Sequence, residues 1–182
     1  MRQTLVDESG AGTHTACVSG QKGPDVKVAT APSARRVQAV LGPDFQVLEF
    51  EASTRTSQEA ATAIGCTLAE IAKSLIFRSA EGRAVLVIAS GVDRVDEKKV
   101  AALLGQSIGR ADAEFVRERT GYAIGGVAPV GHASTPIVLI DSALARLAYV
   151  WAAAGTPNAV FRIAPADLIR LTQARVVDVA KG

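Results

Sequence analysis

The segment from Gly121 to His132 constrains this chain most, because it places four glycines and a proline within twelve residues. Glycine permits positive φ and lets another group approach the backbone closely. Pro129 fixes its own φ and biases Ala128 toward an extended conformation. We therefore expect a loop here, between two structured halves, that can direct several backbone N–H and C=O groups at one small ligand.

The composition limits the class of fold. The chain has 182 residues, which is enough for one well-buried domain and short for two. Hydrophobic residues make up 48% of the sequence and aromatic residues only 4%, so the core must consist mostly of small and branched aliphatic side chains. Such a core favours an α/β or α+β domain over an aromatic-rich β-sandwich. The formal net charge of +2 does not by itself indicate binding to DNA or RNA.

The two cysteines, Cys17 and Cys66, are too few for a disulfide framework, and no Cys/His cluster predicts a zinc site. No apolar run reaches the roughly 18 residues of a membrane-spanning helix. The N-terminus also lacks the charged and then apolar layout of a signal peptide. We therefore expect a reduced, cytoplasmic protein without a metal, a cofactor or a membrane partner.

The first 31 residues differ from the rest of the chain. Ser, Thr, Gly, Ala and isolated charges dominate them without sustained periodicity, which predicts a flexible N-terminal extension over residues 1–31. From residue 32 to residue 182 the pattern is continuous, with no repeat and no linker, and predicts a single domain.

Turn and capping signals divide this domain into elements. Helices are expected at residues 33–41, 57–65, 96–105, 111–119, 142–147 and 165–172, with a helical turn from residue 67 to residue 72. Strands are expected at residues 45–50, 73–77, 84–89, 107–110, 136–140, 149–153, 159–163 and 176–179. Hairpin turns at residues 80–83 and 155–158, mixed with helices, favour an α+β fold with a mixed, mostly antiparallel sheet.

Lys73 is the most unusual single residue. In the strand IAKSLIF, side chains alternate between faces, so Lys73 shares a face with Ile71, Leu75 and Phe77. One hypothesis is that its stem packs there while its amine reaches water. The other is that the lysine lines a pocket, where a partly desolvated ammonium donates to a carbonyl or phosphate group and its pKa falls.

The glycine-rich segment also has two interpretations, a plain turn or a ligand-binding loop. It is not a phosphate loop of the Walker type, because no Gly-Lys-Ser/Thr follows it. It does not match the dinucleotide fingerprint either, because its glycines follow a helix and precede a strand.

Three further residues are candidates for contact with a substrate. His132 either has a structural role or orients a substrate and transfers a proton. Asp141 either caps the helix expected at Ser142 or contacts the site from the end of its strand. Arg55 either shapes the entry to the next helix or binds a phosphate. No G-x-S-x-G motif is present, so an enzyme built on this chain would depend on backbone groups, one lysine and the substrate's own atoms.

Five segments taken together resemble the YbaK/EbsC family, the freestanding relatives of the editing domain of bacterial prolyl-tRNA synthetases. The resemblance covers residues 32–179, and its order and spacing are more specific than any single motif. The matching segments, in chain order, are TSQEAATAIG, IAKSLIF, GYAIGGVAPVGH, PIVLIDSAL and AAAGTPNAVFRIAPADL.

The resemblance implies a barrel-like mixed sheet without a metal, and an enzyme that hydrolyses the ester between a wrong amino acid and the 3′ end of tRNA. The family's lysine corresponds to Lys73, and its loop corresponds to the stretch from Gly125 to Pro129, in which Pro129 is an expected substrate contact. By this resemblance, the backbone of Gly125, Gly126 and Val127 holds the aminoacyl group and its developing oxyanion.

The expected substrate is aminoacyl-tRNA, most naturally tRNA for proline carrying Ala, Cys or Ser, and prolyl-tRNA synthetase is a possible partner. Two alternatives remain open at this point. The domain either binds such a ligand without turnover or docks on a synthetase. The sequence also leaves open whether the protein is a monomer or a homodimer.

Overall fold

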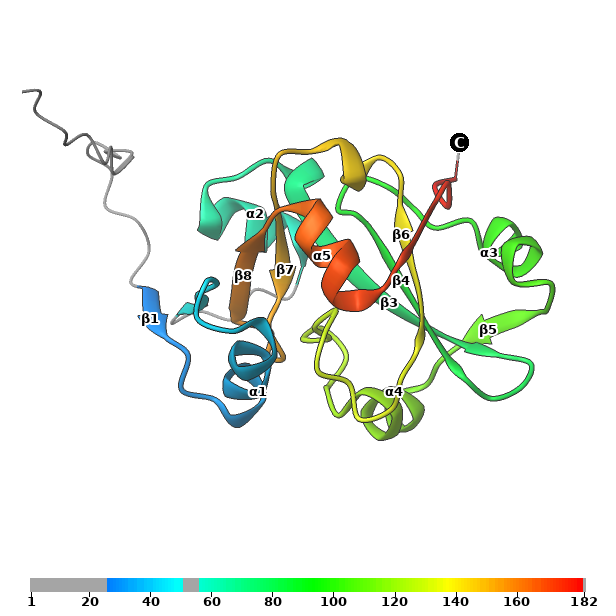
Figure 1. Ribbon diagram of the computed structural model, residues 1–182, viewed down its shortest axis with the longest axis horizontal. Helices are drawn as coiled ribbons and strands as arrows, with labels where there is room; N and C mark the ends of the chain where they lie inside the picture. The colour runs from blue at the N-terminus through cyan, green and yellow to red at the C-terminus, as the bar shows by residue number, and fades with distance from the viewer. Residues whose placement is uncertain (1–25, 51–55, 182) are drawn as a thin grey trace, which may run out of the picture.

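The computed structural model describes residues 26–50 and 56–181, and the apolar run AVLVIAS forms its central strand, β4 (Ala84–Ser90). Every residue of β4 is buried, as is typical of a strand covered on both faces. It pairs on one side with β3 (Ile71–Ser79), antiparallel, and on the other with β6 (Ile137–Asp141), parallel. Figure 1 shows these long strands running through the middle of the molecule.

Nine strands of the described residues form one sheet, in the order β1-β2-β8-β7-β3-β4-β6-β9, with β5 on the end of β3. Five of the eight pairings are antiparallel, so the expected α+β fold with a mixed, mostly antiparallel sheet is confirmed. The sheet is open, with β1 and β9 at its two ends. The remaining strands are β1 (Val26–Val28), β2 (Val47–Phe50), β5 (Ile108–Arg110), β7 (Val150–Ala153), β8 (Ala159–Ile163) and β9 (Arg175–Val177).

Five α-helices of the described residues lie against this sheet, and several begin and end where the sequence predicts. They are α1 (Pro32–Leu41), α2 (Ser57–Ile64), α3 (Glu97–Leu104), α4 (Ala113–Thr120) and α5 (Pro165–Thr172). Side chains cap three N-termini, at Thr56, Asp96 and Asp112, because their oxygens accept backbone N–H groups of the first turn. No helix among the described residues is long and apolar enough to cross a membrane.

Two clusters of buried side chains stabilise the arrangement, one on each face of β4. Leu86 and Ile88 belong to the larger cluster, with α1 and α5, whereas Val85 and Val87 belong to a smaller one that includes Val100 of α3. This division follows from the alternation of side chains along a strand.

Two segments expected to be helical form short 3₁₀ turns instead. The helix expected at residues 142–147 is a 3₁₀ turn at Leu144–Arg146, and the helical turn expected at residues 67–72 is a 3₁₀ turn at Leu68–Glu70. In both, the chain must join the next strand within a few residues, so i→i−3 hydrogen bonds close the turn instead of a longer helix.

The domain starts earlier in the structure than the predicted residue 32. Most of the extension expected at residues 1–31 lies outside the described residues, but its last part contributes β1, which pairs with β2. The Glu49 carboxylate of β2 accepts hydrogen bonds from the backbone N–H groups of Thr30 and Ala31, both at 3.0 Å. The structured part of the chain therefore begins before residue 32.

Candidate functional site

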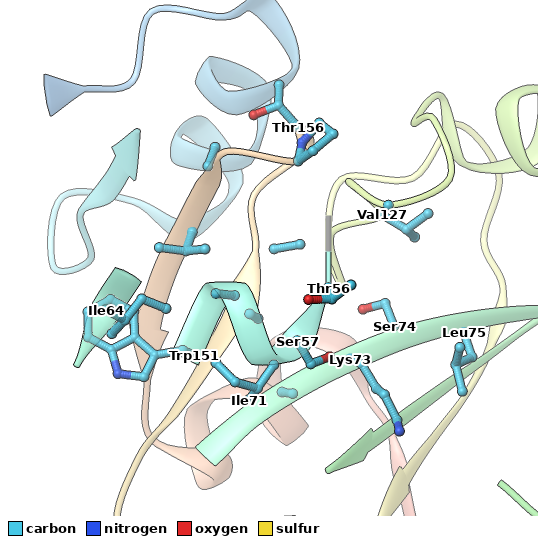
Figure 2. A pocket seen from close by; sticks show the side chains of 18 of the residues that line it. Thr56, Ser57, Ile64, Ile71, Lys73, Ser74, Leu75, Val127, Trp151 and Thr156 are labelled. Atoms are coloured by element: carbon cyan, nitrogen blue, oxygen red, sulfur yellow. The ribbon is translucent and has the colours of Figure 1, made fainter. Parts of the chain in front are cut away.

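A cavity of about 390 Å³ opens where β3 separates from β7. The two strands pair over only two positions, Ile71 with Trp151 and Ala72 with Ala152. The cavity is enclosed by β3, β7, β8, helix α2, the glycine-rich loop and the turn that joins β7 to β8, as Figure 2 shows from close by. Its lining is mainly apolar, with polar groups from Thr56, Ser57, Lys73, Ser74 and Thr156.

Helix α2 forms one wall because local signals fix both of its ends. The Thr56 side chain accepts the N–H of Glu59 while the Glu59 carboxylate accepts the N–H of Thr56, which is a capping box. Gly65 ends the helix in the left-handed conformation. Ala60 and Ile64 then project from one face of this short helix into the cavity lining.

The glycine-rich loop is held in shape from behind, by Tyr122. This side chain is buried, and its hydroxyl donates to the carbonyls of Val130 at 2.7 Å and Gly131 at 3.1 Å, so the far end of the loop is tied to its beginning. The Arg36 guanidinium lies 4.3 Å from the centre of the Tyr122 ring and donates to the Gly121 carbonyl. The loop is therefore a fixed wall of the cavity.

The backbone amides of this loop do not all have the same role. The N–H of Gly126 donates to the Ala123 carbonyl at 3.0 Å, inside the loop. Gly125 and Val127 line the cavity, and their N–H groups have no hydrogen-bond acceptor among the described residues. The Gly126 amide is therefore already engaged within the loop, which leaves the amides of Gly125 and Val127 as candidate donors for the expected contact with a substrate.

Gly126 instead allows two segments of backbone to touch. A Cβ atom at this position would lie 2.8 Å from the Thr156 Cα, closer than real Cβ contacts permit. Thr156 lies in the turn between β7 and β8, and this turn lines the same cavity. The glycine thus brings the loop and the turn together at the cavity wall.

Lys73 also lines the cavity, but its amine points elsewhere. The ammonium donates to the carbonyls of Asp93 and, at 3.4 Å, Gly91, in the segment that follows β4. Figure 2 shows its nitrogen on the side of β3 away from Val127. Burial lowers the pKa of Lys73, an effect that the charge of Asp93 partly opposes.

Lys73 therefore lines the same cavity as the glycine-rich loop, but its ammonium is directed to the segment that follows β4. Of the two hypotheses for Lys73, these contacts and the lowered pKa agree with the one in which the lysine lines a pocket, although the carbonyls that accept from it belong to Gly91 and Asp93 and not to the glycine-rich loop. An ammonium has three donors, and the structure gives this one two carbonyl acceptors.

Ser74 is a site residue that the sequence did not indicate. Its hydroxyl oxygen is buried without a hydrogen-bond partner, which is unusual for a polar group inside a protein. Figure 2 shows Ser74 on the same side of β3 as Val127. A serine within an apolar strand carries no special signal, and only the opening between β3 and β7 makes it a potential donor to a ligand.

The other predicted substrate contacts lie away from the cavity or outside the described residues. Arg55 falls outside the described residues. Pro129 is buried and does not line the cavity. His132 lies behind the loop, where Nε2 is 2.6 Å from the Ala128 carbonyl and the ring packs edge-on against Tyr122, and burial lowers its pKa. A substrate contact is therefore not supported for Pro129 or His132.

Asp141 has a structural role, although it is not the N-cap of the 3₁₀ turn at Leu144–Arg146, which begins at Ala143 without a side-chain cap. Its carboxylate is buried and accepts the N–H of Ala143 at 2.7 Å and the N–H of Val179 at 3.1 Å. Both oxygens are thus engaged by backbone groups at the end of β6, outside the cavity lining. These contacts give no support to the predicted contact between Asp141 and a substrate.

Comparison with known proteins identifies the family. The family described as "Aminoacyl-tRNA editing domain" matches residues 51–171, about two thirds of the chain. The chain belongs to this family. All the residues that line the cavity lie within this matched range of the editing domain.

Individual relatives agree with this assignment. The YwhH protein of Bacillus subtilis (strain 168), which is uncharacterized, is 38% identical over 136 residues, covering 74% of this chain and 87% of YwhH. A proline–tRNA ligase of Thermosipho melanesiensis is 37% identical over 87 residues, 47% of this chain but only 15% of the ligase. A crystal structure of a candidate trans-editing enzyme for prolyl tRNA synthetase has 45% sequence identity to this protein and a TM-score of 0.80. The match covers 85% of this chain and 100% of the chain in that structure.

Proposed function

We propose that this protein hydrolyses the ester bond of mischarged aminoacyl-tRNA, acting in trans on tRNA for proline that carries a small wrong amino acid such as Ala or Cys. The observation that carries the proposal is that Lys73 lines one cavity together with Gly125 and Val127, whose amides have no acceptor in the part of the chain that the structure describes. Membership of the editing-domain family supports it, and so do the matches to a proline–tRNA ligase and to a trans-editing candidate.

The chemistry needs only these groups, because an aminoacyl ester is already activated. Water attacks the ester carbonyl carbon, and the oxyanion that develops accepts hydrogen bonds from the amides of Gly125 and Val127. The bond between this carbon and the ribose oxygen then breaks, and the ribose oxygen takes up a proton. The products are a free amino acid and a tRNA with an intact terminal ribose.

Lys73 has an electrostatic role in this proposal. Its four-carbon stem lets the ammonium exchange the carbonyls of Gly91 and Asp93 for an ester or phosphate oxygen of the substrate. The unsatisfied hydroxyl of Ser74 donates to the aminoacyl group or holds the attacking water. The small side chains of Ala60, Ala152 and Ala159 leave room for a small amino acid beside the ribose.

The test is a deacylation panel with tRNA for proline charged with Ala, Cys, Ser or Pro. We expect release of a small non-cognate amino acid, and we expect Lys73→Ala to lower kcat/KM about 100-fold or more, the order seen when one oxyanion-stabilising group is removed. Lys98→Ala is the matched control, because Lys98 is an exposed lysine of α3 away from the cavity.

Two results would contradict the proposal. Full activity of a folded Lys73→Ala protein would remove Lys73 from the mechanism. Saturable binding of charged tRNA without release of any amino acid would show a binding module instead of an enzyme.

A further inference from the structure

A second cavity, of about 490 Å³, adjoins the first and shares Trp151 with it. Its other notable lining residues are Tyr149, Arg162 and Asp44. Nothing in the proposed hydrolysis uses these side chains. Because both cavities are lined by Trp151, they lie next to each other on the protein.

Strand register places the aromatic and basic side chains on one face. Tyr149 directly precedes β7 and Trp151 is its second residue, so the two side chains lie on the same side of the sheet. Arg162 of β8 is the direct partner of Trp151 in the antiparallel register. The three side chains are therefore neighbours although the sequence separates them by up to 13 positions.

The surface is already ordered without a ligand. The Arg162 guanidinium lies 4.5 Å from the centre of the Tyr149 ring, in a cation–π contact. This contact fixes the basic side chain beside the ring. Even so, Tyr149 is 37% exposed and leaves ring surface open to a partner.

The chemistry of this cavity suits nucleobases better than phosphates. Its lining carries one basic residue, Arg162, and one acidic residue, Asp44, so it has no excess of positive charge to attract a phosphate backbone. Aromatic rings and a planar guanidinium instead offer stacking surfaces, which is how proteins hold unpaired bases of single-stranded RNA. An unpaired base stack that leads to an aminoacylated ribose is the 3′ end of a charged tRNA.

We propose that the second cavity binds the unpaired bases that precede the terminal nucleotide of the tRNA, stacked on Tyr149 and Trp151 beside Arg162. This inference rests on the proposed function, since it assumes that the terminal ribose enters the first cavity. It assigns the single-stranded 3′ end, and not the duplex stem, as the part of the RNA that this face recognises.

Trp151 supplies the measurement, because it is the only tryptophan of the chain. An uncharged RNA hairpin with an unpaired 3′ CCA end is titrated into the full-length protein while Trp fluorescence is followed. We expect saturable quenching with this hairpin and none with a blunt hairpin of the same stem. Tyr149→Ala and Arg162→Ala should each raise the Kd about fivefold or more, the effect of losing one stacking contact.

Two variants serve as controls. Tyr149→Phe keeps the ring and should bind like the wild type. Arg175→Ala removes an exposed strand arginine from β9, at the far end of the sheet, and should also leave the Kd unchanged.

The outcomes separate this inference from the proposed function. Quenching by the CCA hairpin that Tyr149→Ala and Arg162→Ala weaken, in a protein without deacylase activity, would refute the hydrolysis and support the 3′-end site. Deacylation with an unchanged KM in both variants, or equal quenching by the blunt hairpin, would overturn the 3′-end site. Quenching by neither RNA would likewise overturn it and would leave this face to a protein partner.

Discussion

At the scale of single residues, the candidate site depends on contacts between backbone segments as much as on side chains. Gly126 shows this clearly, since its N–H closes the loop on Ala123 while its missing side chain admits the backbone of Thr156. Lys73 shows the complementary case, in which a charged side chain at the cavity edge is held by backbone carbonyls. In both residues, the position relative to a distant main-chain segment determines the role.

Gly126→Ala tests the close approach between the loop and the turn. The added Cβ would lie 2.8 Å from the Thr156 Cα, so the loop or the turn must shift. We expect a loss of about 1–3 kcal/mol in the free energy of unfolding, as for other overpacked positions, and a fall in deacylation because the amides of Gly125 and Val127 move with the loop. Urea denaturation and deacylation rates provide the measurements.

Gly109→Ala is the matched control, because nothing lies within 4 Å of the Cβ that it would gain and its φ is not in the left-handed region. Equal effects of the two substitutions on stability would show that the contact with Thr156 is unimportant.

At the scale of secondary-structure elements, the ends of strands carry the polar interactions that hold neighbouring segments. The carboxylate of Asp141 at the end of β6 ties the following turn, through Ala143, to the C-terminal segment, through Val179. Val179 itself is fully buried in the smaller core cluster with Val100 of α3. One acidic side chain thus joins three segments of the chain at positions that do not line the cavity.

Asp141→Ala is expected to lower the free energy of unfolding by about 2 kcal/mol or more, because it leaves two backbone N–H groups without their buried acceptor. Denaturation gives the loss, and hydrogen exchange at Val179 should rise before that of β4. The variant should keep wild-type kcat/KM under conditions where it is folded. A selective loss of activity in the folded protein would instead restore Asp141 as a substrate-binding residue.

At the scale of the whole molecule, the order of strands joins the start of the described chain to its later half. β2 lies between β1 and β8, so the Glu49 carboxylate fastens Thr30 and Ala31 to a strand whose other neighbour is formed about 110 residues later. Burial of Glu49 raises its pKa, but hydrogen bonds from Thr30 and Ala31 outweigh this effect, and the net pKa is lowered. This carboxylate therefore links stability to pH.

The lowered pKa of Glu49 determines whether the free energy of unfolding rises or falls with pH. A glutamate whose folded-state pKa is lowered stabilises the fold fully above its unfolded-state pKa, and this contribution is lost as the pH falls through the folded-state pKa. We expect the free energy of unfolding to decrease from about pH 5 downward, and Glu49→Gln to remove part of that decrease while destabilising the protein at pH 7. Denaturation at a series of pH values gives both quantities.

Glu81→Gln is the control, since Glu81 is an exposed glutamate in the turn between β3 and β4. If this variant and Glu49→Gln showed the same pH profile, the hydrogen bonds of Glu49 would contribute nothing to the linkage.

The local features of this protein could be predicted from its sequence because their causes lie within a few residues. The caps at Thr56 and Asp96, the glycine ends of α2 and α3, and the strand alternation that divides Leu86 and Ile88 from Val85 and Val87 all depend on neighbours in the chain. The five segments, in their order along the chain, likewise indicate the editing-domain family from the sequence alone.

The tertiary structure alone determined which groups meet. The sequence placed Lys73 correctly in a strand, but its amine is directed by carbonyls 18 and 20 residues away. The Asp141 carboxylate accepts a hydrogen bond from a backbone N–H 38 residues later in the chain. Ser74 lines a cavity only because β3 and β7 pair at two positions and then separate. Hydrogen-bond partners and cavities arise from packing between distant segments, so no local pattern of residues can encode them.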